Sequence, residues 1–290
     1  MLKRIAQILP ALALSTLAAS CTPPSSHAPT DIQSGATAGI FQPKYLKAKN
    51  FGINGQKIIV LTFDDGPQRG VTDSVLDLLK REGIKASFFI EGDHVRGNED
   101  LLQRMHDEGH VVANHTYTHR NLIKLHHNES FSSVYSEVAE TDRLIAPYVR
   151  SDSRFYFRAP GGSFNTRGTT DATDYLNQYP EMQKYIGPVY WDIGGQITYV
   201  NADGSSSVDN IATDYIKSAA DWDCWKKQIS VATCTAAYKA ETDSFNGGII
   251  LMHDHDIRTY EMVRTLIPIW KRAGYTFITM DEIPNVDQFQ

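Results

Sequence analysis

The sequence is poor in basic clusters and in cysteine, and it has no long apolar run. Its 290 residues carry a net charge of -6, and no cluster of Lys and Arg appears after residue 5. A nucleic-acid surface needs such clusters to neutralise phosphates, so we expect no nucleic-acid partner. The apolar run that ends at Ala19 is shorter than the ~20 residues that span a bilayer, which excludes a transmembrane helix there. The hydrophobic fraction of 41% and the charged fraction of 21% are ordinary for a soluble globular chain of one large or two small domains.

The N-terminal residues have the layout of an export signal. Lys3 and Arg4 precede the apolar run, and small residues stand before Cys21, as in secretory signal peptides. A cysteine directly after "LAAS" also resembles the lipobox of bacterial lipoproteins, where the cysteine is lipidated and becomes the mature N-terminus; ordinary cleavage and release is the alternative. We therefore expect a signal peptide over residues 1–20. The protein is then expected in the cell envelope, held at a membrane by lipid on Cys21, or secreted if Cys21 carries no lipid.

The cysteine count supports the lipidated form. The chain has 3 cysteines, and an odd count needs an explanation in an exported protein. With Cys21 lipidated, Cys224 and Cys234 remain and are expected to form a disulfide in an oxidising compartment. Three unrelated thiols are the alternative.

The rest of the chain divides into a tether and a domain of alternating strands and helices. Residues 21–50 begin with a stretch rich in Pro, Ser, Thr, Gly and Ala and are expected to be a flexible tether, with residues 51–290 forming the domain. Expected strands cover 57–63, 85–92, 110–114, 154–160, 187–194, 247–254 and 276–283, and expected helices cover 71–84, 98–109, 130–149 and 259–275. This alternation predicts an α/β fold with parallel strands and helices outside, closed into a barrel or left as an open sheet. Residues 196–242 break the rhythm and are interpreted as an insertion before the last strands.

Polar residues gather where the predicted strands end. The C-terminal ends of parallel strands form one face of a barrel, and that face carries the chemistry, so we expect these groups to lie together. In chain order they are Asp64 and Asp65, His115 and His119, Arg158, Trp191 and Asp192, and His253 and Asp254.

The segment "HTYTH" predicts half of a metal site. His115 and His119 are four residues apart, so on a helical turn both imidazoles point the same way. Two histidines alone are more often surface groups, but with an aspartate from another strand end they form a three-ligand site typical of catalytic zinc. Such a site also explains the two adjacent carboxylates of Asp64 and Asp65, because one can bind the cation while the other serves as a general base.

Four segments in order, "TFDDGP", "HTYTH", "RAPGG" and "ILMHD", resemble the motifs of the NodB-type polysaccharide deacetylases, carbohydrate esterase family 4. The resemblance covers about Lys57 to Pro284. It implies a distorted (β/α) barrel and a metal-dependent hydrolase that removes acetyl groups from N-acetylated sugars. It also implies that Asp65, His115 and His119 bind zinc or another divalent metal such as cobalt, with Asp64 as the catalytic base.

The same resemblance assigns the remaining catalytic roles. His253 is expected to be the catalytic acid that protonates the departing amine, and Arg158 is expected to hold Asp64 ionised and oriented. The backbone N–H of Gly161 is expected to bind the oxyanion together with the metal. Trp222 and Leu251 are expected to wall the pocket for the acetyl methyl group, with core packing as the alternative for each.

The fourth motif departs from the family pattern. The family has Asp, two residues and Asp-Trp after the strand that carries Trp191, whereas this chain has "WDIGGQIT" there. The carboxylate that tunes His253 is therefore either Asp192 or Asp221, and Asp221 is favoured because Trp222 follows it. We expect Trp191 and Asp192, at a strand end, to lie near the site in either case.

Several substrates and two other classes of protein fit these residues. Peptidoglycan N-acetylglucosamine or N-acetylmuramic acid is the preferred substrate, chitin oligomers are second, and O-acetylated xylan is third. A non-sugar amidohydrolase is one alternative, and a catalytically impaired carbohydrate-binding envelope protein is another. The complete catalytic set argues against the impaired protein, and the altered fourth motif argues for it. We expect a monomer.

Overall fold

A computed structural model describes residues 41–289 except 167, 196, 201–205 and 210–219. The predicted signal peptide, Cys21 and most of the predicted tether lie outside the described residues, so those expectations stay predictions. Among the helices that are described, none is long and apolar enough to cross a membrane.

Parallel strands form a ring around the interior of the domain. They are β1 (Phe41–Leu46), β2 (Ile58–Asp64), β3 (Ser87–Ile90), β4 (Val111–Asn114), β5 (Phe155–Tyr156), β6 (Tyr185–Val189), β9 (Gly248–His253) and β10 (Thr276–Ile278). All of the predicted strands overlap observed ones, and most of them are short, buried, largely apolar runs of the kind that parallel sheets need; the edge strand β10 is only partly buried.

Two single bridges close this ring. β2 pairs with β9 on one side and with β3 and β10 on the other, and β3 pairs with β4. The bridge between Asn114 and Phe157 leads on to β5 and β6, and the bridge between Ile193 and Ile250 returns to β9. Because single bridges replace full ladders at these two places, the barrel is distorted, as the resemblance implied.

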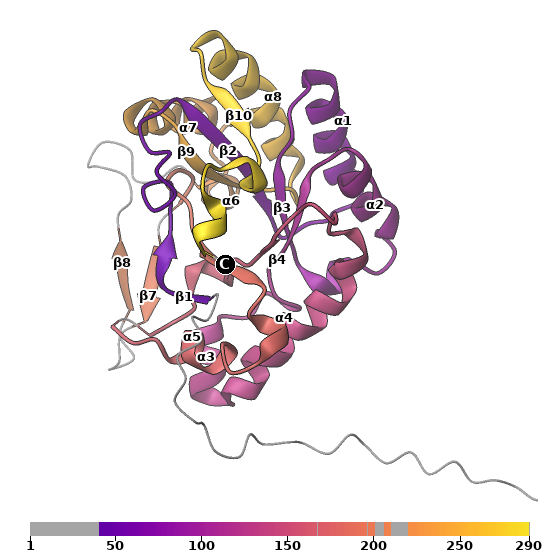
Figure 1. Ribbon diagram of the computed structural model, residues 1–290. Coiled ribbons are helices and arrows are strands. Elements are labelled where there is room, and N and C mark those ends of the chain that lie inside the picture. The colour runs from indigo at the N-terminus through magenta and orange to yellow at the C-terminus, as the bar shows by residue number, and fades with distance from the viewer. Residues whose placement is uncertain (1–40, 167, 196, 201–205, 210–219, 290) are drawn as a thin grey trace, which may run out of the picture. The chain divides into compact units, whose positions relative to one another are not determined.

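The helices lie outside the strands. They are α1 (Thr72–Glu82), α2 (Glu99–Asp107), α3 (Leu122–Asn128), α4 (Phe131–Ile145), α5 (Asp171–Leu176), α6 (Asp221–Lys226), α7 (Val231–Phe245) and α8 (Ile257–Arg272). Figure 1 shows α1, α2 and α8 beside β2, β3 and β10. Val75, Leu78 and Leu79 of α1 are buried, as their helical spacing predicted.

Residues 41–50 were predicted to belong to the tether, but they are part of the folded domain. β1 pairs in parallel with β6, and Phe41 is 1% exposed. The ring of Phe41 packs against Phe157, Phe164 and Tyr185 at centroid distances of 5.2, 5.5 and 5.8 Å. Burial of an aromatic ring in this cluster fixes the segment to the barrel, so the folded domain begins before residue 51.

The predicted insertion over residues 196–242 is only partly an addition to the barrel. Its described part contains the antiparallel hairpin of β7 (Ile197–Val200) and β8 (Ser206–Asp209), followed by α6 and most of α7. α7 packs against α8 and leads into β9, which is the place of a regular connecting helix. The hairpin and α6 are therefore the elements that interrupt the alternation.

Candidate active site

The adjacent aspartates at the end of β2 point to different partners. Asp64 is the last residue of the strand and is 2% exposed, and Arg158 Nη1 donates to its Oδ1 at 2.6 Å. Asp65 has a φ of 69°, which turns the chain sharply and directs its carboxylate towards the histidines. Two neighbouring carboxylates are tolerated because Arg158 offsets the charge of Asp64 and the histidines offset that of Asp65, although His115 Nε2 also lies 3.5 Å from Asp64 Oδ2.

Arg158 is buried inside the barrel and holds Asp64 rigidly. Its guanidinium also donates to Thr62 Oγ1 at 2.8 Å and to the carbonyl of Val189 at 3.1 Å. It stacks over the ring of Phe89 with its Cζ atom 4.0 Å from the ring centroid. A guanidinium stays protonated in proteins, so Asp64 has a permanent positive neighbour, as the resemblance implied.

His115 and His119 converge, but not on a helical turn. β4 ends at Asn114, and the following loop has left-handed backbone at Thr116 (φ 69°) and His119 (φ 52°). The helical turn predicted from the four-residue spacing is therefore wrong, although the ring centroids lie 5.2 Å apart. His115 Nδ1 lies 2.8 Å from the carbonyl of Arg158, which leaves Nε2 free to face Asp65.

The three predicted ligands fit a divalent cation. Asp65 Oδ1 lies 3.3 Å from His115 Nε2 and 3.2 Å from His119 Nε2. Ligand atoms at ~2.0–2.1 Å from a tetrahedral zinc are separated by roughly 3.3 Å, so these spacings match. Asp65 Oδ1 is also buried and has no hydrogen-bond partner among the described residues, which a cation would supply.

Electrostatics favour an ionised Asp65. Burial by itself would raise the pKa of Asp65, but His253, His115 and His119 together lower it well below its usual range. The pKa of His119 is lowered by burial and by His115, which favours the neutral imidazole that binds metals.

His253 is paired with Asp221. His253 Nδ1 lies 2.6 Å from Asp221 Oδ1, and Asp221 Oδ2 accepts from the His253 backbone N–H and from Thr259 Oγ1, both at 2.8 Å. Burial would lower the pKa of His253, but Asp221 and then Asp65 raise it to about 10. Asp221 therefore occupies the tuning position that the sequence left open between two residues.

The carboxylate of Asp192 is held by backbone amides and not by His253, so the alternative in which Asp192 tunes His253 is wrong. Its Oδ2 accepts backbone N–H groups from Ala48 at 3.1 Å and from Ile249 at 2.9 Å. Burial raises its pKa, and these two hydrogen bonds act against that effect. Asp192 thus fastens the segment after β1 to the start of β9, four residues before His253.

A pocket of about 440 Å³ brings the other predicted residues together. It is lined by Asp64, Asp65, His115, His119, Asn121, Gly161, Trp191, Trp222, Leu251 and His253. Gly161 has a φ of 56°, and Trp222 is 44% exposed at the rim. Sequence reasoning missed Asn121, whose side chain accepts from the Lys124 N–H as the N-cap of α3; an Asn before an apolar run was the available signal.

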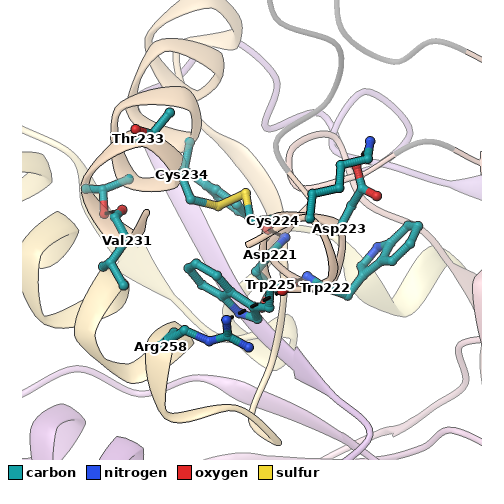
Figure 2. Close-up of a disulfide and its surroundings, with 12 residues drawn as sticks. Asp221, Trp222, Asp223, Cys224, Trp225, Val231, Thr233, Cys234 and Arg258 are labelled. Atoms are coloured by element: carbon teal, nitrogen blue, oxygen red, sulfur yellow. Dashed lines mark hydrogen bonds and ion pairs between the residues drawn. A yellow bond between two sulfur atoms is a disulfide. The ribbon is translucent and has the colours of Figure 1, made fainter. Parts of the chain in front are cut away.

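A disulfide stabilises the wall that carries Asp221 and Trp222. Cys224 of α6 and Cys234 of α7 are bonded, with their Cα atoms 6.2 Å apart. Figure 2 shows this bond beside Asp221 and Trp222. The pairing deduced from the cysteine count is the one that the structure contains.

Comparisons with known proteins find relatives over most of the chain. A family model described as polysaccharide deacetylase matches residues 52–179. The peptidoglycan-N-acetylmuramic acid deacetylase PdaA of Bacillus subtilis is 31% identical over 258 residues, which cover 89% of this chain and 82% of PdaA. The structure of the Bc1960 peptidoglycan N-acetylglucosamine deacetylase matches with a TM-score of 0.56 at 26% identity, covering 78% of this chain and 87% of that one.

These matches define the class. The chain belongs to the polysaccharide deacetylase family. A further relative, the peptidoglycan-N-acetylglucosamine deacetylase PgdA of Listeria monocytogenes, is 30% identical over 241 residues, or 83% of this chain. The chain spans 41% of the length of that relative, so the two proteins correspond only in this domain.

Proposed function

We propose that this domain removes N-acetyl groups from an acetylated envelope polysaccharide, with peptidoglycan first and chitin oligomers second. One observation carries the proposal: Asp64, the three-ligand cluster around Asp65 and His253 all line one pocket, with Arg158 behind Asp64 and Asp221 behind His253. The names of the relatives, which include peptidoglycan and chitooligosaccharide deacetylases, support the choice of substrate.

The chain's residues divide the work of amide hydrolysis. Asp65, His115 and His119 would hold a divalent ion, which would supply a Lewis acid for the acetyl carbonyl and for the attacking water. Asp64, oriented by its hydrogen bond from Arg158, accepts the proton of the attacking water. The N–H of Gly161 offers a hydrogen bond to the oxyanion, and His253 donates its proton to the departing amine nitrogen.

We also propose a place in the cell envelope for the protein. The signal peptide and the cysteine after "LAAS" support a lipid anchor, and a tethered domain meets peptidoglycan before any other acetylated polymer. Zinc is our proposed metal because two imidazoles and one carboxylate are ligands that it prefers, and cobalt is the alternative.

Acetate release by the full-length protein tests the proposal. Peptidoglycan, chitin pentamer and acetylated xylan are assayed before and after chelation, with zinc or cobalt added back and Asp64→Asn as the blank. Chelator-sensitive release from the N-acetylated substrates that Asp64→Asn abolishes is the expected result. Release from xylan alone would indicate an esterase, and no release by the metal-loaded protein would favour the carbohydrate-binding alternative.

A further inference from the structure

The loop that carries two of the three metal ligands is held by a residue from a distant helix. The main chain of this loop, residues 115–119, has costly left-handed backbone at the β-branched Thr116 and at His119. Such a conformation persists only where surrounding contacts determine it. The hydrogen bonds of the loop's main chain therefore show what keeps the two imidazoles together.

The two ends of the loop are anchored differently. On the β4 side, the N–H of His115 donates to the carbonyl of Ile90 at 2.9 Å, and the N–H of Thr116 donates to Asn114 Oδ1 at 2.9 Å. These contacts continue the sheet and fix His115. The carbonyls of Thr116 and Tyr117 also accept the N–H groups of Gly92 at 2.9 Å and Asp93 at 3.0 Å, but none of these contacts reaches Thr118, in the half of the loop that leads to His119.

Glu137 of α4 anchors that second half. Its Oε2 accepts the backbone N–H groups of Tyr117 at 3.0 Å and Thr118 at 2.8 Å, and its Oε1 accepts Thr118 Oγ1 at 2.5 Å. Glu137 is 8% exposed and forms no ion pair with another described residue. The partners of its carboxylate are therefore the donors of the loop. Hydrogen bonds from two adjacent amides to one carboxylate are short and strong, and they define the course of the chain.

We propose that Glu137 is a positioning residue for the metal site. His119 directly follows Thr118, so the place of its imidazole depends on where Glu137 holds that residue. Without these acceptors the loop can relax from its left-handed conformation, and His119 moves away from Asp65 Oδ1. The inference rests on the metal site of the proposed function, but not on the reaction that the site performs.

Zinc affinity, measured by competition with a chromophoric chelator, tests this role directly. Glu137→Met fills the same space without acceptors, and we expect its zinc Kd to rise by roughly 10–100-fold, as for other residues that orient metal ligands. Glu137→Gln keeps an acceptor oxygen for both amides and can donate to Thr118 Oγ1, so its Kd is expected to stay within about threefold of wild type. Glu140→Met, on the same helix but exposed and paired with Arg143, is the matched control.

Amide hydrogen exchange of the metal-free protein supplies a second readout. In Glu137→Met we expect at least tenfold faster exchange at Tyr117 and Thr118 than in wild type, with unchanged exchange at His115. A zinc Kd of Glu137→Met within twofold of wild type overturns the proposal, as does a Glu137→Gln variant as weak as Glu137→Met. If the wild-type protein binds zinc but releases no acetate, the proposed function fails while this inference stands.

Discussion

Asp221→Asn in the metal-free protein isolates the cause of the unusual basicity of His253. The pKa of His253 is raised to about 10 although burial acts in the opposite direction, and Asp221 is the largest of the groups that raise it. The rise above the ordinary value of 6.5 corresponds to about 5 kcal/mol in favour of the imidazolium. Asn keeps an oxygen that accepts from Nδ1, so the substitution removes the charge and leaves the ring in place.

We expect the pKa of His253 in Asp221→Asn to fall by at least about 2 pH units, equivalent to about 3 kcal/mol. Asp65 and Asp64 also raise the pKa of His253 and remain in the variant, so they limit the fall. An NMR titration of the His253 ring protons in both proteins, with all metal removed by chelator, measures the change. A pKa that stays above 9 in the variant would refute Asp221 as the cause.

The same variant predicts a change in the pH profile of the zinc-loaded enzyme. In the proposed reaction His253 is the proton donor, and a general acid in this role contributes ~10²–10⁴-fold to the rate. When the pKa of His253 falls, less imidazolium is present at high pH, so kcat/KM of Asp221→Asn should decline from pH 6 to pH 8 more steeply than that of wild type. Parallel profiles for the two proteins would mean that His253 does not act as the acid.

Three further predictions concern stability. Burial lowers the pKa of His110 to about 4, so the unfolded chain binds a proton that the folded one rejects between pH 6.5 and 4. Stability should therefore fall by about 3 kcal/mol as the pH drops through this range, and urea melts of His110→Asn should lack that part of the loss. Gly66→Ala would place a Cβ 2.3 Å from Asp254 Oδ1, and we expect a loss of about 1–3 kcal/mol from overpacking; an unchanged urea midpoint would show that the buried carboxylate can move. Replacing Cys224 and Cys234 by Ser should cost about 2–3 kcal/mol and lower Tm by roughly 5–10 °C in a thermal melt, and a Tm within 1 °C of wild type would contradict this.

The sequence was sufficient for the parts of the site that short segments determine. Asp64 and Asp65 stand at the end of a buried strand, and the C-terminal ends of the strands in a parallel barrel all lie on the same face. Arg158 could be assigned through the family resemblance because its motif is local. The convergence of His115 and His119 was also predicted, but for the wrong reason, since a loop and not a helical turn brings them together.

Contacts between distant segments could not be predicted in the same way. Asp192 and Asp221 each stand next to a tryptophan in the sequence, so both were candidates for tuning His253. Only the fold shows that Asp221 faces His253 while Asp192 binds backbone amides. Glu137 gave no signal, because an acidic residue in a helix usually faces water. The helix α7 was missed because its sequence, "VATCTAAYKAETDSF", has little apolar periodicity.

The site separates the tasks of its acidic residues by the kind of partner that each one has. Asp64 is held by Arg158, a cation that cannot lose its proton, which suits the proposed base. Asp65 faces imidazoles that can exchange their protons for a metal ion, which suits a ligand. Asp221 faces His253 and keeps it protonated, which suits an acid. Because the left-handed backbone at Asp65 turns the two neighbouring carboxylates apart, Asp64 meets Arg158 while Asp65 meets His119, and the chain can place the proposed base and the proposed metal ligand one residue apart.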